Sequence, residues 1–342
     1  MKKTFLYFCL LFIVQTAFAA DSLYVREQQI PILIDRIDNV LYEMRIPAQK
    51  GDVLNEITIQ IGDNVDLSDI QAIRLFYSGV EAPSRKGEHF SPVTYISSHI
   101  PGNTRKALES YSVRQDEVSA PLSRTVKLTS KQPMLKGINY FWVSIQMKPE
   151  TSLLAKVATT MPNAQINNKP IDITWKGKVD ERHVGIGVRQ AGDDGSAAFR
   201  IPGLVTTNNG TLLGVYDIRY NSSVDLQEKI DIGVSRSTDK GQTWEPMRVA
   251  MTFKQTDGLP HGQNGVGDPS ILVDEKTNTI WVVAAWTHGM GNERAWWNSM
   301  PGMTPDETAQ LMLVKSEDDG KTWSEPINIT SQVKDPSWYF LL

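Results

Sequence analysis

The sequence predicts an all-β protein in which an N-terminal β-sandwich precedes part of a β-propeller. Residues 22–173 read as short strand-like runs separated by turn signals, residues 203–329 contain two similar four-strand units, and no long amphipathic helical pattern interrupts either region. A sheet that is apolar on one face must bury that face against another layer, which favours a sandwich for the first region. Four-strand units repeated around an axis make a propeller, which accounts for the second.

Residues 1–19 are expected to be a signal peptide rather than part of the fold. Lys2 and Lys3 form a charged start, residues 5–14 an apolar run, and residues 17–19 a small-residue cleavage site. The apolar run is too short to cross a bilayer, and no later stretch is long and apolar enough to do so. Cys9, the only cysteine, lies in this segment, so the mature chain is expected to contain no disulfide. The sequence therefore predicts a secreted or periplasmic protein without a membrane span.

Composition argues against two classes of function. The 342 residues include 35 Lys and Arg against 39 Asp and Glu, a formal net charge of -4, and no basic block suggests binding to nucleic acid. The 5 histidines show no metal-ligand spacing, so no metal and no cofactor are expected.

The first domain is expected to span residues 20–178. Residues 56–61 alternate strictly and place three isoleucines on one face, and residues 141–147 alternate again. Tyr140 and Trp142 have two interpretations, core packing or a platform for sugar, and core packing is favoured because large aromatic side chains are normally buried.

Residues 179–342 are expected to form the incomplete propeller. The strands of the first unit are predicted at 203–205, 211–216, 231–235 and 244–249, and those of the second at 269–273, 279–284, 310–315 and 323–329.

Each unit carries the pattern Ser-x-Asp-x-Gly-x-Thr-Trp between its third and fourth strands, at residues 237–244 and 316–323. We expect Asp239 and Asp318 to cap backbone amides of a tight turn whose glycine supplies an unusual backbone angle. The tryptophans that end the pattern are expected to pack between neighbouring sheets. Residues 316–320 do not match a calcium-binding EF-hand loop, because their acidic residues lack the required spacing.

Arg200 is a candidate binding residue because it stands in the sequence Phe199-Arg200-Ile201-Pro202, where an ordinary strand would carry apolar residues. A guanidinium beside a rigid proline presents a two-pronged donor to a carboxylate. Asp225 follows the second strand of this unit, at the end where a ligand pocket is expected.

The second unit supplies two further candidates. Asp268 begins this unit, at the position taken to be equivalent to Arg200 in the first. Trp296 lies in the insertion 289–308, where it could wall an apolar niche or simply pack the loop, and residues 304–307 resemble a helix start.

The Phe-Arg-Ile-Pro sequence with its two repeated patterns resembles the FRIP motif and Asp boxes of the bacterial secreted sialidase (neuraminidase) family, and the first domain resembles the region that precedes the propeller in some of its members. The resemblance implies a six-bladed propeller, of which this chain would contain two to three blades, and an exo-α-sialidase that releases terminal sialic acid from glycoproteins or glycolipids. It assigns Arg200 to the sugar carboxylate, Asp225 to general acid/base catalysis, and Arg219 and Asp268 to contacts with the sugar's hydroxyl and acetamido groups. A trans-sialidase and a non-catalytic glycan-binding propeller are the alternatives.

Three further expectations follow from this resemblance. Asp225 would need a raised pKa to hold a proton, and partial burial favours that. The family's other two arginines, its nucleophilic tyrosine and the glutamate beside it cannot be placed in this sequence, so the chain alone is expected to be a truncated form with weak activity or none. Tyr339 is rejected as the nucleophile because it is expected in the early part of a strand of the wrong blade.

Overall fold

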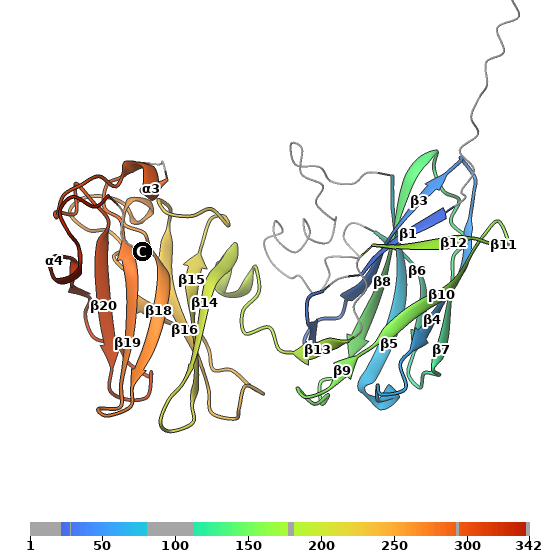
Figure 1. Cartoon of the computed structure of the whole chain (residues 1–342), viewed down its shortest axis with the longest axis horizontal. Coiled ribbons are helices and arrows are strands. Elements are labelled where there is room, and N and C mark those ends of the chain that lie inside the picture. The colour runs from blue at the N-terminus through green and yellow to red at the C-terminus, as the bar shows by residue number, and fades with distance from the viewer. Residues whose placement is uncertain (1–21, 28, 81–111, 177–180, 292–293, 340–342) are drawn as a thin grey trace, which may run out of the picture.

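The structure is a computed structural model that describes residues 22–27, 29–80, 112–176, 181–291 and 294–339 (Figure 1). The predicted signal peptide lies outside these residues. Strands dominate both parts of the chain, which confirms the all-β prediction. No described helix is long and apolar enough to cross a membrane.

The described residues of the N-terminal part form three sheets. Their strand orders are β12-β1-β3-β8-β5-β6, β11-β10-β4-β7 and β2-β13-β9. The strand bounds are β1 Ser22–Glu27, β2 Ile32–Leu33, β3 Asn39–Ala48, β4 Leu54–Ile61, β5 Ile70–Gly79, β6 Val113–Ser119, β7 Thr125–Thr129, β8 Gly137–Met147, β9 Lys156–Val157, β10 Thr159–Ile166, β11 Lys169–Pro170, β12 Asp172–Lys176 and β13 Arg182–Gly185.

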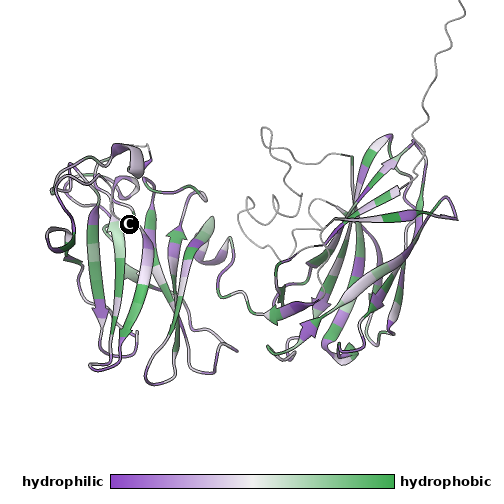
Figure 2. Cartoon of the chain, viewed as in Figure 1, coloured by the Kyte–Doolittle hydropathy of each residue, from purple (hydrophilic) through white to green (hydrophobic). Residues whose placement is uncertain are grey.

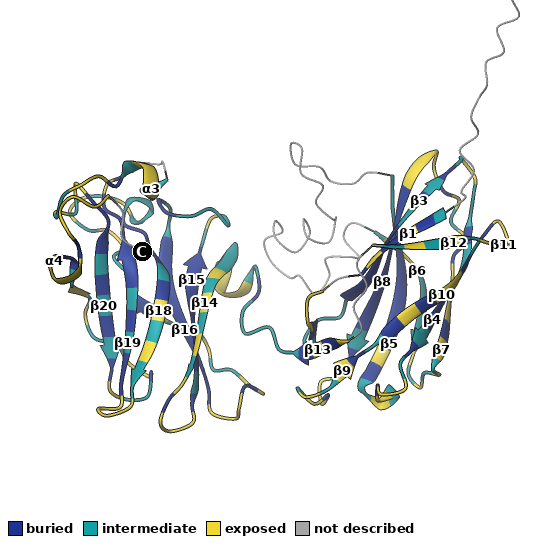
Figure 3. Cartoon of the chain, in the orientation of Figure 1, coloured by how far each residue is buried: buried dark blue, intermediate teal, exposed yellow. Residues whose placement is uncertain are grey.

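One cluster of buried apolar side chains joins the six-stranded and four-stranded sheets. Ile57, Ile59 and Ile61 of β4 are each 0% exposed and belong to this cluster, together with Phe141 and Val143 of β8. Because side chains alternate between the two faces of a strand, the spacing predicted for residues 56–61 places these isoleucines in the core. Figure 3 shows the buried strands, and Figure 2 shows how apolar residues follow them.

The second face of β8 is buried as well. Tyr140 and Trp142 pack with Val40 and Phe76 in a separate small cluster, and the Trp142 indole donates a hydrogen bond of 2.7 Å to the Ser78 hydroxyl. The core interpretation of Tyr140 and Trp142 is therefore confirmed.

A connecting segment follows β12 and contacts both parts of the chain. Although β13 lies beyond the predicted boundary at residue 178, it pairs with β2 and β9, so N-terminal strand pairing extends to Gly185. The Gln190 side chain then bonds to Asp35 and Arg36, whereas the Arg189 guanidinium donates to the Glu245 carbonyl at 3.1 Å.

In the C-terminal part, the residues that the structure describes form two four-stranded antiparallel sheets in simple meander order, β14-β15-β16-β17 and β18-β19-β20-β21. The strand bounds are β14 Ala198–Thr206, β15 Leu212–Arg219, β16 Ile230–Ser237, β17 Arg248–Met251, β18 Val266–Asp274, β19 Thr279–Trp286, β20 Gln310–Ser316 and β21 Ile327–Asn328. Two one-turn helices, α3 Ala295–Asn298 and α4 Thr330–Val333, accompany the second sheet. These are the two predicted repeat units, and they are called here the first and second propeller sheets.

The two propeller sheets share one core. Leu213 and Val215 of β15 pack in the same buried cluster as Ile280 and Val282 of β19. The odd-numbered side chains of β15 therefore face the second sheet, and the even-numbered ones point to the opposite face.

The repeated pattern forms the same turn in both sheets. Asp239 accepts a hydrogen bond of 2.9 Å from the Thr243 amide, and Asp318 accepts one of 2.9 Å from the Thr322 amide. The glycines of the two turns have left-handed φ angles of 87° at Gly241 and 79° at Gly320. The architectural interpretation of the two aspartates is confirmed.

The tryptophans of the two turns differ in position. Trp323 packs against the core shared by the two sheets, as expected. Trp244 lies instead beside Gly214, an even-numbered residue of β15 on the face turned away from the second sheet. Gly214 is equivalent to Val282 of the second sheet, whose face carries Trp323, so the two tryptophans lie on equivalent faces of their own sheets. The second sheet does not cover this face of the first sheet, so the expectation is confirmed for Trp323 and stays a prediction for Trp244.

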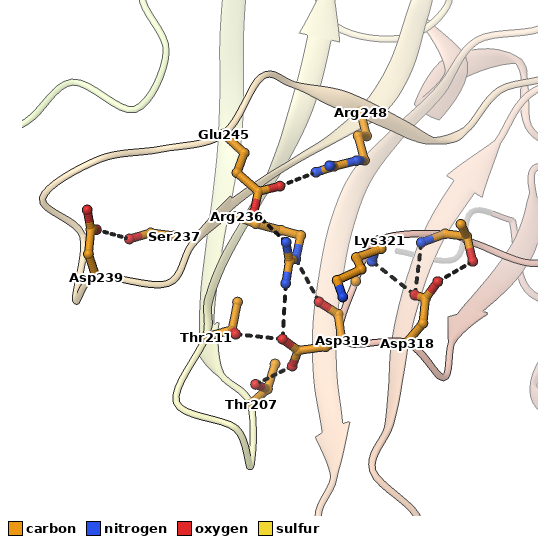
Figure 4. Close-up of polar contacts among 12 residues, drawn as sticks. Thr207, Thr211, Arg236, Ser237, Asp239, Glu245, Arg248, Asp318, Asp319 and Lys321 are labelled. Atoms are coloured by element: carbon orange, nitrogen blue, oxygen red, sulfur yellow. Dashed lines mark hydrogen bonds and ion pairs between the residues drawn. The ribbon is translucent and has the colours of Figure 1, made fainter.

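The second turn also bonds to the first sheet (Figure 4). The Asp319 carboxylate accepts hydrogen bonds of 2.6 Å from the hydroxyls of Thr207 and Thr211, which flank the β14–β15 hairpin. The Arg236 guanidinium of β16 donates to the same carboxylate at 3.1 Å and to the Asp319 carbonyl at 2.8 Å. This network stabilises the register between neighbouring sheets.

The two turn aspartates should make stability fall in acid. Hydrogen bonds from Thr243 and Ser237 lower the pKa of Asp239 from 3.8 to about 2. Burial opposes ionisation of Asp318, but hydrogen bonds from Thr322 and nearby amides outweigh it and set its pKa at about 2. These two carboxyl groups hold protons less tightly in the folded state than in the unfolded state. Their contribution to the free energy of unfolding is therefore complete above about pH 4 and is lost as the pH falls towards 2.

Urea unfolding between pH 5 and pH 2 measures this contribution. The double variant Asp239→Asn, Asp318→Asn should lose less stability over that interval than the wild type. Asp306→Asn, which changes an exposed carboxyl, should follow the wild-type curve. Equal acid slopes in all three proteins would contradict the assignment.

The last described residues differ from expectation. After β21 the chain forms α4 and then an irregular segment, so Tyr339 does not lie in a strand. Its carbonyl accepts hydrogen bonds from the hydroxyls of Ser299 and Thr308, which hold it against the insertion of the second sheet rather than in a third sheet.

Candidate active site

The first strand of each propeller sheet has a bulge at the predicted site. Between Arg200 and Gly203, β14 has one residue more than the facing part of β15, and β18 repeats this between Gly267 and Ser270. The extra residue of a bulge re-aims the neighbouring side chains, and bulges are frequent beside active sites.

This register corrects the expected equivalence of the two units. The left-handed residue of the first bulge is Ile201, with φ 53°, and that of the second is Asp268, with φ 58°. Asp268 is therefore equivalent to Ile201, and Gly267 is equivalent to Arg200. The expected equivalence is therefore wrong by one residue. Each bulge contains a proline, Pro202 in β14 and Pro269 in β18, and these two prolines are the equivalent positions.

Asp225 lies at the centre of an arginine cluster. Its Oδ1 atom accepts a hydrogen bond of 2.8 Å from Nη1 of Arg200 and another from Nη1 of Arg219. Both guanidinium groups also donate to the Ser223 carbonyl at 3.0 Å, which fixes the loop between β15 and β16. The structure thus brings Arg200, Arg219 and Asp225 together at one end of the first sheet.

Arg219 is anchored from behind by Asp217. Both side chains are 1% exposed, and Asp217 Oδ2 accepts hydrogen bonds of 3.0 Å from Nε and 2.7 Å from Nη2 of Arg219. The remaining nitrogen, Nη1, is the one directed at Asp225. Burial raises the pKa of Asp217 to about 6, and the adjacent charge of Arg219 opposes that shift.

Asp217 also positions Asp268. Its Oδ1 atom accepts a hydrogen bond of 2.9 Å from the Asp268 amide, which stabilises the left-handed backbone there. The half-buried Asp268 carboxyl has a raised pKa, because burial outweighs the attraction of Arg219. Asp217 was not among the site residues predicted from the sequence. The signal for its role was its two-residue spacing from Arg219, which places both side chains on one face.

The expected raised pKa of Asp225 is not found. Burial does favour the protonated form, but the hydrogen bond and charge of Arg219, and then the charges of Arg200 and Arg294, lower the pKa below its ordinary value. Burial of this side chain, which is 37% exposed, is the largest single influence on the pKa, but the three guanidinium groups together outweigh it. In this state Asp225 is an ionised, paired carboxylate.

Arg294 is a site residue that sequence reasoning did not select. Its Nη1 atom donates to the Asp225 carbonyl at 3.3 Å, and its guanidinium lies 5.7 Å from the centre of the Trp296 ring. Arg294 thereby connects Trp296, which is 42% exposed, to the loop that carries Asp225.

The helix of the insertion starts earlier than expected. It is α3, which contains Trp296, whereas residues 304–307 form an isolated turn. Glu307 accepts hydrogen bonds from the amides of Met303 and Thr304, as in a helix cap, but no helix continues beyond it. Residues 308–310 instead enter β20, whose pairing with β19 outweighs the local cap signal.

No described residues form a group of three or more His, Cys, Asp or Glu side chains suited to a metal ion. The chemistry available at this end of the first sheet is that of arginines and carboxylates. Such a site can bind an anion and, once a proton is held on a carboxyl, donate it.

Comparisons with known proteins show which family this chain resembles. Residues 20–170 match the N-terminal domain of BNR-repeat neuraminidase, and residues 201–342 match a BNR repeat-like domain. A sialidase of Bacteroides fragilis is 58% identical over 348 residues, which cover 100% of this chain and 64% of that protein. A sialidase of Paraclostridium sordellii is 35% identical over 39% of this chain and 30% of its own length.

A solved sialidase structure is also similar to this chain. The Hadza microbial sialidase Hz136 superposes with a TM-score of 0.79 at 62% identity, covering 93% of this chain and 62% of its own. The chain therefore spans less than two thirds of the length of the relatives that resemble it most strongly here. The two matched domains, the full-length alignment at 58% identity and the shared fold establish that this chain belongs to the sialidase family.

Proposed function

We propose that this chain carries the carboxylate-binding and acid/base part of an exo-α-sialidase, a glycoside hydrolase that releases terminal sialic acid from glycoproteins or glycolipids. The observation that supports it best is the Arg200–Asp225 pair at the bulge of β14, with 42% and 37% of the two side chains exposed. Arg200 is the accessible guanidinium of the cluster, since Arg219 is 1% exposed. An accessible, pre-positioned guanidinium suits recognition of a sugar carboxylate.

Substrate binding would change the state of Asp225. A sugar carboxylate on Arg200 competes with Asp225 for the same donor and brings a negative charge close to it. Both effects favour the protonated carboxyl, so the pKa of Asp225 should rise from its lowered value when substrate binds. Asp225 would then hold the proton that the leaving oxygen needs, and Asp217 would keep Arg219 and Asp268 in place around the sugar.

The remaining assignments extend this proposal. Trp296, with Arg294 over its ring, would contact the sugar from the α3 side. Residues 1–19 would direct secretion or export to the periplasm, and the two repeated turns would be the Asp boxes of the family.

Calorimetric titration of the chain with the unsaturated sialic acid analogue 2-deoxy-2,3-didehydro-N-acetylneuraminic acid tests the binding role. Arg200→Ala should weaken binding by about 10- to 100-fold, since a hydrogen bond to a charged group contributes about 1.5–3 kcal/mol. The methyl ester of the analogue should bind equally weakly to both proteins. Arg248→Ala, which removes a similarly exposed arginine beside Glu245, is the control. Equal affinities of the wild type and Arg200→Ala would refute the assignment.

A further inference from the structure

A pocket lies at the same end of the first propeller sheet as the Arg200–Asp225 pair. Its volume is about 620 Å³, a size suited to a small ligand. It is lined by Tyr220, Lys229, Asp231, Lys254, Gln255, Gly258, Pro260 and His261. None of the residues assigned to the proposed active site is among them.

The pocket and the proposed active site use opposite faces of this sheet. Asp217 faces the second sheet, where it bonds to Asp268. Asp231 is paired directly with Ile218, so its side chain shares the even-numbered face of β15. A ligand in this pocket would therefore not occupy the space beside Asp225.

A buried carboxylate organises the pocket wall. Asp231 is 3% exposed and accepts hydrogen bonds of 2.9 Å from the Tyr220 hydroxyl and 2.8 Å from Nε2 of His261. The two rings stand edge to face, with their centres 5.9 Å apart. Two side chains that come from different loops are thus held in one arrangement by the same carboxyl group.

The loop that carries Pro260 and His261 is held by Asn264, which is 0% exposed. Its side-chain amide donates to the carbonyls of Thr256, Leu259 and Pro260 at 3.3, 3.0 and 3.3 Å. Three carbonyls on one buried amide fix the loop that follows β17. A loop ordered in advance lowers the entropic cost of binding.

Two lysines, Lys229 and Lys254, line the pocket. The Nζ atom of Lys229 lies 4.6 Å from the centre of the Tyr220 ring, and Lys254 is exposed. Within the described part of the chain, neither lysine forms an ion pair with a carboxylate, whereas Lys127, Lys156 and Lys315 do. The lining carboxylate, Asp231, is already engaged by Tyr220 and His261.

We propose that this pocket binds a carboxylate-bearing sugar, distinct from the sugar whose bond is cleaved. Lys229 and Lys254 would bind the carboxylate, Gln255 would meet hydroxyl groups, and the fixed Tyr220 and His261 rings would provide the wall. The inference rests on the proposed function only in taking sialylated glycans as the natural ligand. The anion could equally come from a uronic acid, because the chemistry recognised is the carboxylate.

The test is saturation-transfer NMR and calorimetry on the chain carrying Arg200→Ala, with the α2,8-linked dimer of N-acetylneuraminic acid as the probe. We expect binding to persist in this protein. Adding Lys229→Gln and Lys254→Gln should weaken it at least about tenfold, since two charge-assisted contacts are lost. Adding Lys240→Gln and Lys276→Gln instead should leave the affinity for the dimer unchanged. This control is matched, because Lys240 and Lys254 both have left-handed backbones and the control pair lies at the opposite end of the sheets.

Each outcome is decisive. No binding of the dimer to Arg200→Ala, or equal binding of the dimer by the two triple variants, would overturn the pocket. Binding by the wild type that disappears in Arg200→Ala would overturn the pocket while leaving the proposed function intact. If the dimer still binds to Arg200→Ala, and the wild type and Arg200→Ala bind the unsaturated analogue with equal affinity, the pocket is supported and the proposed function is refuted. Loss of binding when the dimer is methyl-esterified would show that the carboxylate is recognised. Comparing the affinity of a glucuronic acid disaccharide with that of the dimer would show which sugar the pocket prefers.

Discussion

Replacing Asp225 by Asn is expected to reduce kcat for sialyllactose by about 10²–10⁴-fold, the usual contribution of a general acid. The same substitution should affect an aryl α-sialoside far less. A sugar hydroxyl is a poor leaving group that needs a proton as the glycosidic bond breaks, whereas a phenolate leaves without one. The difference between the two substrates is the signature of acid catalysis, because a purely structural role would slow both alike.

The measurement compares kcat on both substrates for the wild type, Asp225→Asn and the control Asp268→Asn. Where turnover by the chain alone is too slow, the same variants are made in a fusion to the part of the Bacteroides fragilis sialidase that lies outside the matched region. Asp268→Asn should raise KM for both substrates without separating them by leaving group. Parallel losses on the two substrates in Asp225→Asn would show that Asp225 is not the acid.

Replacing Asp217 by Ala should lower the free energy of unfolding by about 3–5 kcal/mol, the range observed when one partner of a buried ion pair is removed. Arg219 would stay 1% exposed with two of its nitrogens deprived of their acceptor. The Asp268 amide would lose its acceptor as well. Asp225→Ala is the control, since Asp225 is 37% exposed and its loss should cost less than about 1 kcal/mol.

The pH dependence gives Asp217 a second signature. Its pKa is raised from 3.8 to about 6, so the folded state binds the proton more tightly than the unfolded state does. The protonated carboxyl is therefore favoured in the fold, and this group's contribution to stability falls as the pH rises from about 4 to about 6. Urea unfolding across that interval should show this slope in the wild type and not in Asp217→Asn. Unchanged stability in Asp217→Ala would contradict the buried-pair account.

The architecture could be read from local patterns. Alternation placed Ile57, Ile59 and Ile61 in the core, and the repeated turns marked the third and fourth strands of each propeller sheet. Both features depend on residues close in sequence, which is why they could be predicted. The location of Arg200 and Asp225 depended on a resemblance, and the structure places them in contact.

What the sequence did not reveal depends on contacts between distant residues. The bulges that fix the equivalence of Asp268 with Ile201 appear only when two strands pair, although alignment of Pro202 with Pro269 gives the same equivalence. The lowered pKa of Asp225 follows from three arginines, of which Arg294 comes from another sheet's insertion. Partial burial alone gave the wrong direction because these charges could not be counted before folding.

The most direct test of the account is a crystal structure of the chain with N-acetylneuraminic acid bound. The account predicts the sugar carboxylate on the Arg200 guanidinium, with Asp225 released from Arg200 and facing the anomeric oxygen. Arg219 should keep its bonds to Asp217, because that pair is buried and does not contact the ligand's carboxylate. A sugar bound elsewhere, with the 2.8 Å contact between Arg200 and Asp225 intact, would contradict the central claim.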